Sequence, residues 1–109
     1  MTDIHRELAE ALFELERELR ALALWDETPP SPDALASTQP FAVDTLELYQ
    51  WLQFVFIPRL YRLVEHRMGL PASCSVSPMA EEYFRPRQES GEAVIAVLER
   101  IDILITSAP

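Results

Sequence analysis

Hydrophobic residues recur every three or four positions along two stretches of the chain, one near each end. In residues 3–24 the leucines fall on one face of a helix, and glutamates from Glu7 to Glu18 form its polar flank. Residues 89–107 carry a similar face built from valine, leucine and isoleucine. We predict a helix over each stretch.

The longest predicted helix spans residues 44–68 and is apolar on nearly every side in its first half. Asp44 and Glu47 stand at the spacing of a capping box, so we expect the helix to begin at Asp44. Gly69 and Pro71 predict its end. Because a helix that is apolar all round must be covered by several neighbours, we expect this one to be central.

Pro58 interrupts the central helix. It has no N–H group, its ring crowds the carbonyl of Phe54, and it costs roughly 3 kcal/mol relative to alanine in a helix interior. We therefore expect a kink at Pro58. The favoured compensation is geometric, because a bend lets the apolar half lie in the middle of the fold. The alternative is that the freed Phe54 carbonyl accepts a hydrogen bond from a polar side chain or a ligand.

Two Ser-Pro pairs predict short helices over residues 31–36 and 77–84. The chain has only two glycines, which argues against the tight turns of a multi-stranded sheet. The expected fold is all-α: one compact domain, residues 1–109, built as a bundle of three long and two short helices. The predicted core consists of apolar residues on the inner helix faces: Leu8, Leu12, Leu15, Leu19, Trp51, Leu52, Val55, Phe56, Leu60, Leu63, Val94, Leu98, Ile101, Leu104 and Ile105.

The charge of the chain restricts its partners. It has 18 acidic and nine basic residues, a net charge of −9. This argues against direct nucleic-acid binding, which needs clustered positive charge, and against docking on an anionic membrane. The longest apolar run, residues 93–98, is too short to span a bilayer, and the N-terminus is too polar for a signal peptide. We expect a cytoplasmic protein.

The sequence shows no pattern of catalytic or metal-binding residues. Cys74 is the single cysteine, and no nucleophile motif surrounds it. His5 and His66 do not stand at ligand spacing with each other or with Cys74. There is also no glycine-rich phosphate loop. We expect no catalytic residue, no metal and no cofactor.

Six polar residues in and after the proline-rich connection are the candidate binding residues: Ser37, Thr38, Gln39, Asp44, Gln53 and Arg59. A structural role is favoured for each, with Asp44 capping the central helix and Gln53 bonding to the connection before it. The alternative is a small-molecule-binding protein or an enzyme whose pocket these residues line. Arg59 would then hold a carboxylate or phosphate.

Four apolar residues lie off the main stripes of their helices: Phe13, Leu24, Ile95 and Ile103. Scattered apolar residues are normal on protein surfaces, but residues that converge in space mark an interface. These four are the candidate interface residues. They leave open a protein-binding module and a structural homodimer.

The stretch STQPF at residues 37–41, the pair DT at 44–45 and the segment WLQFVFIPR at 51–59 resemble the YqcC-like family of small bacterial proteins, most of them uncharacterised. The resemblance extends over the full length. It implies a helical bundle and an association, by name and gene context, with tRNA pseudouridine synthase C.

Such synthases are large mixed α/β enzymes with a catalytic aspartate and a basic RNA cleft, whereas this chain is short and acidic. We do not expect it to isomerise uridine alone; any catalysis would be linked to the synthase. The leading interpretation is a non-catalytic interaction module, accessory to tRNA pseudouridine modification, that binds the synthase and not the RNA.

Overall fold

The computed structural model of the protein describes residues 3–87 and 90–107. In chain order its elements are α1 (Ile4–Ala21), α2 (Pro32–Leu35), the 3-10 turn η1 (Pro40–Ala42), α3 (Leu48–Trp51), the π-helical stretch η2 (Leu52–Phe56), α4 (Ile57–Glu65), α5 (Ser77–Phe84) and α6 (Glu92–Thr106). No strand occurs within the described ranges, and the predicted all-α fold is confirmed.

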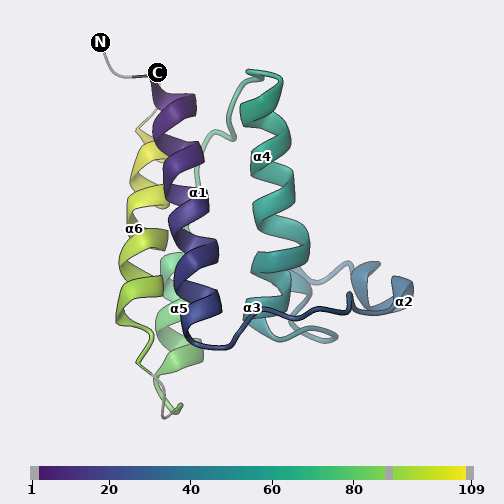
Figure 1. Ribbon diagram of the computed structural model, residues 1–109. Coiled ribbons are helices and arrows are strands. Elements are labelled where there is room, and N and C mark those ends of the chain that lie inside the picture. Colours follow the sequence, from purple (N-terminus) through teal and green to yellow (C-terminus); the bar gives the residue numbers. More distant parts are fainter. Residues whose placement is uncertain (1–2, 88–89, 108–109) are drawn as a thin grey trace.

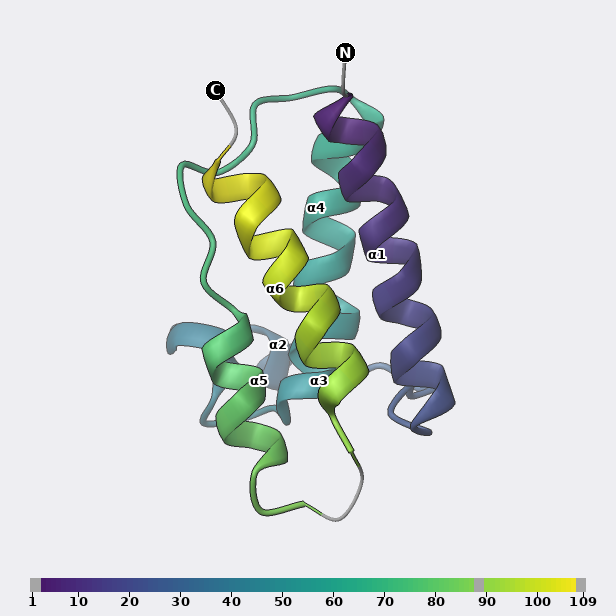
Figure 2. The ribbon, with the colours of Figure 1, turned by 90° about the vertical axis from the view of Figure 1, so that its left-hand side faces the viewer.

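Three long helical segments run side by side and form the body of the molecule (Figure 1). α1 packs against both α6 and α4, and the start of α1 lies at the same end of the molecule as the end of α6. α5 packs against α6 and touches α3 at the opposite end, as Figure 2 shows from the side. The connection that contains α2 extends beyond α4 at that same end.

The core lies between the inner faces of α1, α4 and α6. Five residues of α1 are fully buried: Leu8, Ala11, Leu12, Leu15 and Leu19. Burying a leucine side chain stabilises the fold by about 1.5–3 kcal/mol, so this face contributes much of the stability. Most of the predicted core residues are buried. Trp51, Leu63 and Leu104 are only partly covered, and Val55 lies outside the core cluster.

The central helix begins at Leu48 and not at Asp44 as predicted. Glu47 is its N-cap residue and forms a capping box with Gln50: the N–H of Glu47 donates to the side-chain Oε1 of Gln50 at 2.9 Å. Asp44 instead accepts a hydrogen bond from Ser37. The residues before Leu48 form turns, so the helix is four residues shorter at its start than the sequence spacing indicated.

The predicted distortion at Pro58 takes the form of a change in helix type. Leu52–Phe56 is π-helical, and the N–H of Ile57 donates to the carbonyl of Leu52, five residues earlier. Pro58 then occupies the first turn of α4, where a missing N–H is tolerated. What offsets the cost of the proline, a bend or the freed carbonyl of Phe54, stays a prediction.

The central helix also ends earlier than predicted, at Glu65. Arg67 adopts a left-handed conformation, with φ 47°, and the N–H of Met68 donates to the carbonyl of Leu63 at 2.9 Å. This pattern is a Schellman motif, which usually has glycine at the left-handed position. Gly69 has no positive φ and is not the helix stop that the sequence indicated.

α1 ends by the same motif, at Ala21 and not near residue 24. Ala23 takes the left-handed conformation, with φ 60°, and the N–H of Leu24 donates to the carbonyl of Leu19 at 2.9 Å. The motif turns the side chain of Leu24 back onto the core, where it is 8% exposed. The chain therefore leaves both α1 and the central helix through non-glycine residues in a conformation that favours glycine.

The short helices are found where the Ser-Pro pairs predicted them. The side chain of Ser31 accepts the N–H of Ala34 at 3.1 Å and caps α2. α5 covers the predicted range of residues. α6 begins at Glu92 and not at residue 89, which itself lies outside the described residues, and ends at Thr106.

Candidate functional site

The six predicted polar residues do not come together in one pocket. Gln53 is buried in the central helix and bonds to the connection before it, as predicted. Its Oε1 accepts the N–H of Asp26 at 2.8 Å and its Nε2 donates to the carbonyl of Asp26 at 2.7 Å. This amide pair fixes the connection after α1 against the central helix, so Gln53 has a structural role here.

Ser37 and Asp44 form a second, separate group in the connection. The hydroxyl of Ser37 donates to Oδ1 of Asp44 at 2.5 Å and accepts the N–H of Gln39 at 3.1 Å. Thr38, Gln39 and Asp44 are exposed, and Arg59 is exposed on α4. A binding site built jointly from Gln39, Asp44, Gln53 and Arg59 is therefore not formed.

A cavity of about 320 Å³ opens instead between the segment that precedes α3 and the outer face of α5. Most of its wall is apolar, with carboxylates at Glu47 and Glu82. We call it the α3–α5 pocket. It is lined by Phe41, Val43, Leu46, Glu47, Leu48, Met79, Glu82 and Tyr83. Its volume lies at the lower end of the range for ligand pockets, about 300–1,000 Å³.

One wall of the α3–α5 pocket is a strained stretch of backbone. Phe41 and Ala42 both have positive φ, 58° and 49°, which costs about 1–3 kcal/mol for each residue that is not glycine. Contacts nearby hold this conformation: the hydroxyl of Thr45 donates to the carbonyl of Ala34 at 2.7 Å. The ring of Phe41 meets that of Trp51 edge to face, with centroids 4.9 Å apart. The wall is thus preformed.

The hydroxyl of Tyr83 is buried in the opposite wall with no hydrogen-bond partner among the described residues. Burial raises the pKa of Tyr83, and the nearby carboxylate of Glu47 raises it further. Glu47 acts on the hydroxyl both as a hydrogen-bond acceptor and through its charge, although the contact falls outside strict hydrogen-bond geometry. Since buried polar groups are nearly always partnered, this hydroxyl is an exception that needs an explanation.

This pocket was not predicted from the sequence, although Phe41 lies in the family-like stretch. One signal was present in α5, where Met79 and Tyr83 stand four residues apart on one helix face. Ala80 and Phe84, at the same spacing, form the buried face. An α5 with two apolar faces indicates a second surface beside the core.

The four predicted interface residues differ in exposure. Leu24 belongs to the core, which corrects the prediction for this residue, and Ile95 is half-buried against the core. Phe13 and Ile103 are 61% and 64% exposed on α1 and α6. Charged residues occupy the groove between these two helices, including Glu14 and Arg100, which form an ion pair at 2.7 Å.

Cys74 lies in an environment that suppresses thiol chemistry. Burial and the adjacent carboxylate of Asp102 raise the pKa of Cys74 to about 12. The same carboxylate accepts the N–H groups of Val76 and Ser77, each at 2.9 Å, and so caps the start of α5 from α6. The sequence did not reveal this cross-helix cap, because Asp102 is distant from α5 along the chain.

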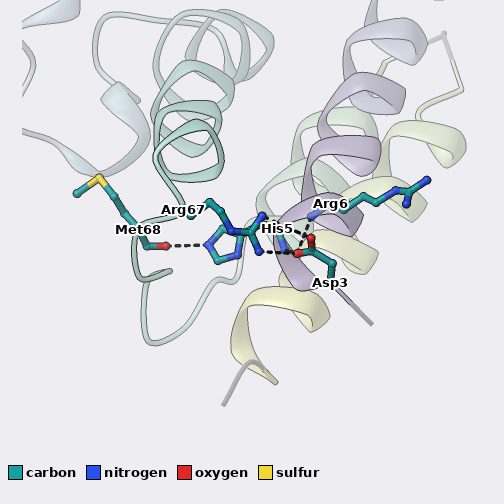
Figure 3. Close-up of polar contacts among 5 residues, drawn as sticks. All are labelled: Asp3, His5, Arg6, Arg67 and Met68. Carbon is teal, nitrogen blue, oxygen red and sulfur yellow. Dashed lines mark hydrogen bonds and ion pairs between the residues drawn. The ribbon is translucent and has the colours of Figure 1, made fainter. Parts of the chain in front are cut away.

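A polar cluster joins the start of α1 to the end of α4 (Figure 3). Asp3 accepts the N–H of His5 at 3.1 Å and pairs with both terminal nitrogens of Arg67 at 3.2 and 3.4 Å. The side-chain hydrogen bond from Arg67 lowers the pKa of Asp3. The Nε2–H of His5 donates to the carbonyl of Met68 at 2.9 Å. The contacts of Asp3 with Arg67 and of His5 with Met68 hold the two helix ends together.

Among the described residues, no group of three or more histidine, cysteine, aspartate or glutamate side chains is placed to hold a metal ion. None of the helices that these residues form is long and apolar enough to cross a bilayer.

Comparison with known proteins finds related sequences. The model of the family DUF446, described as tRNA pseudouridine synthase C, matches residues 7–104. A tRNA pseudouridine synthase C from Pectobacterium carotovorum subsp. carotovorum is 35% identical over 83 residues, which is 76% of this chain and 22% of that protein. This chain thus spans only a minor part of that relative.

Two further relatives are close to this chain in size. The uncharacterised protein YqcC of Escherichia coli (strain K12) is 37% identical over 90 residues, 83% of each chain. An uncharacterised protein of Haemophilus influenzae is 38% identical over 78 residues, 72% of this chain and 74% of that protein.

A solved structure has the same fold. The solution NMR structure of Escherichia coli YqcC matches with a TM-score of 0.85 at 32% identity, covering 99% of this chain and 92% of the other. The YqcC-like resemblance of residues 37–59 is therefore confirmed, and the chain belongs to the family DUF446.

Proposed function

We propose that this protein is a non-catalytic interaction module that binds a tRNA pseudouridine synthase in the cytoplasm and assists its action on tRNA. The observation that carries the proposal is the Pectobacterium relative. There the region similar to this chain is 22% of a protein named tRNA pseudouridine synthase C, so most of that protein lies outside the similar region.

A chain that is not covalently linked to the synthase needs a binding surface of its own. Two parts of one polypeptide meet at a high effective concentration that the linker provides. A chain that is not linked reaches the same association only if it binds its partner through contacts of its own. The proposal therefore requires a docking surface on this protein.

The charge of the chain supports a protein partner over RNA. At a net charge of −9, it would be repelled by phosphate groups, whereas an enzyme that binds tRNA must present positive charge. Opposite charges on the two proteins would speed their association and favour this partner over others.

The test is co-purification of the full chain with the tRNA pseudouridine synthase C of the same organism. We expect a complex with a dissociation constant of about 1 µM or tighter. A pseudouridine synthase of another specificity is the control for non-specific charge attraction. The chain alone should neither isomerise uridine in tRNA nor retain tRNA. Failure to co-elute with the synthase at concentrations well above that constant would refute the proposal.

A further inference from the structure

We propose that the α3–α5 pocket is the surface that docks the synthase, and that it receives an apolar side chain flanked by arginine or lysine from that enzyme. This inference rests on the proposed function and adds the place and the chemistry of the contact. Three properties of the pocket carry it: its preformed apolar wall, its acidic rim and the unpartnered hydroxyl of Tyr83.

The pocket is apolar where a ligand would enter and is not closed by the protein itself. Val43 lines it and is 63% exposed, while Leu46 and Leu48 form a buried floor. The strained backbone at Phe41 and Ala42 keeps the wall in place. Such strain is found where the surrounding structure enforces it, commonly at ligand-binding sites. A preformed pocket also reduces the ordering that binding requires.

The charge of the pocket rim determines which kind of occupant is suitable. Glu47 and Glu82 are both exposed and are the charged residues that line the pocket; Glu82 also pairs with Arg85 at 2.9 Å, just outside the lining. An occupant with positive charge beside its apolar anchor is therefore favoured over an acidic one. An enzyme that binds tRNA carries arginine and lysine on its surface. Charge complementarity therefore favours a segment of the synthase over a second copy of this acidic chain.

The buried hydroxyl of Tyr83 supplies the polar contact. It has no hydrogen-bond partner among the described residues, and it can donate to a backbone carbonyl of an inserted segment once that segment displaces the side chains that cover it. A tyrosine hydroxyl is protonated at neutral pH and can donate, and burial raises the pKa of Tyr83 further. Docked peptides combine apolar anchors with a few such hydrogen bonds.

The other exposed apolar residues are less suitable. Phe13 and Ile103 are exposed on α1 and α6, and neither lines the α3–α5 pocket; mainly charged residues line the groove between these helices. They therefore provide matched controls.

The first experiment compares Val43→Asp with Ile103→Asp in a calorimetric titration of the synthase. The two wild-type residues are β-branched and almost equally exposed, at 63% and 64%. We expect Val43→Asp to weaken the complex about tenfold or more, and Ile103→Asp to leave it unchanged. Thermal melts followed by circular dichroism establish that both variants are folded.

A second pair tests the charge of the rim. Glu82→Arg reverses a charge at the pocket, and Glu81→Arg makes the same change at the adjacent residue of α5, which is exposed and does not line the pocket. We expect Glu82→Arg alone to weaken binding and to reduce the dependence of the affinity on salt.

A third variant separates binding from folding. Tyr83→Phe keeps the ring and removes only the unpartnered hydroxyl, so it should not lower the melting temperature. It should weaken the complex by about threefold to tenfold. A variant that lowers the melting temperature and leaves the affinity unchanged would show a structural role for the hydroxyl and count against docking.

The outcomes distinguish the two proposals. If the wild-type chain does not bind the synthase, the proposed function fails. If it binds and the Val43, Glu82 and Tyr83 variants bind equally well, only the pocket is overturned. Light scattering that finds a dimer of this chain, dissociated by Val43→Asp, would assign the pocket to a second copy and overturn the synthase as its occupant.

Discussion

The two glycines of the chain differ in the space around them. Gly91 precedes α6, and a Cβ atom at this position would overlap the ring of Phe84 at the end of α5. Gly69 follows the end of α4, and a Cβ atom there would meet nothing within 4 Å. Neither glycine has a positive φ, so the difference between them is one of space and not of backbone conformation.

We predict that Gly91→Ala lowers the free energy of unfolding by about 1–3 kcal/mol, because Phe84 is buried and its ring must shift to admit the added methyl group. Gly69→Ala is the matched control and should change this free energy by less than about 0.5 kcal/mol. Urea denaturation measures both. Equal effects of the two substitutions would show that the close approach of Gly91 to Phe84 is not important for stability.

Backbone conformation is the residue-scale feature that the sequence could not reveal. All four described residues with positive φ are non-glycine: Ala23, Phe41, Ala42 and Arg67. Sequence rules place glycine or asparagine at such positions, and the chain has no asparagine. For this reason, the end of α1, the end of the central helix and the pocket wall at Phe41 were not predicted.

At the scale of elements, α5 depends on a cap that comes from another helix. Asp102 of α6 accepts the first N–H groups of α5 and also the thiol of Cys74, at 3.0 Å. A carboxylate at a helix N-terminus bonds to N–H groups that have no partner in the helix and interacts favourably with the helix dipole. The contact therefore fixes the position of α5, and with it one wall of the α3–α5 pocket.

We predict that Asp102→Ala lowers the free energy of unfolding by about 1–3 kcal/mol, since two buried N–H groups of α5 lose their partner. It should also lower the pKa of Cys74, because Asp102 is one cause of its rise to about 12. Alkylation of Cys74 at mildly alkaline pH should then be faster in the variant than in the folded wild-type protein.

Glu99→Ala is the control for this substitution. Glu99 is an exposed acid one turn earlier on α6, and its removal should affect neither stability nor thiol reactivity. If Asp102→Ala and Glu99→Ala behave alike in both measurements, α5 is held by packing and not by the cap.

The sequence predicted the presence of each main helix, whereas the start of the central helix depends on contacts between distant residues. The Ser-Pro signals located α2 and α5 correctly, because an N-cap acts within a few residues. For the central helix two signals overlap: Asp44 and Glu47 have capping-box spacing, and so do Glu47 and Gln50. The structure uses the second pair, since Asp44 is bonded to Ser37. Local spacing could not decide between them.

At the scale of the whole molecule, all three tyrosines of the chain titrate above their usual range. Burial is the main cause for each, and it raises the pKa of Tyr49, Tyr61 and Tyr83. A group whose pKa is raised in the folded state adds stability that is complete below its unfolded-state pKa, about 10 for tyrosine. This contribution is lost as the pH rises through the folded-state value.

We therefore predict that the free energy of unfolding falls as the pH rises above about 10. Ultraviolet absorbance of the folded protein should show less phenolate at a pH of about 10.5 than the same protein in denaturant. Complete ionisation at that pH, with an unchanged circular dichroism spectrum, would contradict the burial of these side chains.

The candidate site is a property of the whole molecule, which is why the sequence did not predict it. The α3–α5 pocket combines residues 41–48 with residues 79–83, and its shape depends on how these two non-adjacent segments pack. The residues chosen from the sequence, such as Gln53 and Asp44, have hydrogen-bond partners within the fold. Gln53 bonds to the backbone of Asp26, and Asp44 accepts a hydrogen bond from the side chain of Ser37.

The central claim is that this chain binds a tRNA pseudouridine synthase through the α3–α5 pocket. The most direct measurement is an isothermal titration of the purified synthase with the wild-type chain and with Val43→Asp. The account predicts saturable binding by the wild type and an affinity about tenfold or more lower for the variant. Absence of binding by the wild type, or equal affinities for the two proteins, would contradict it.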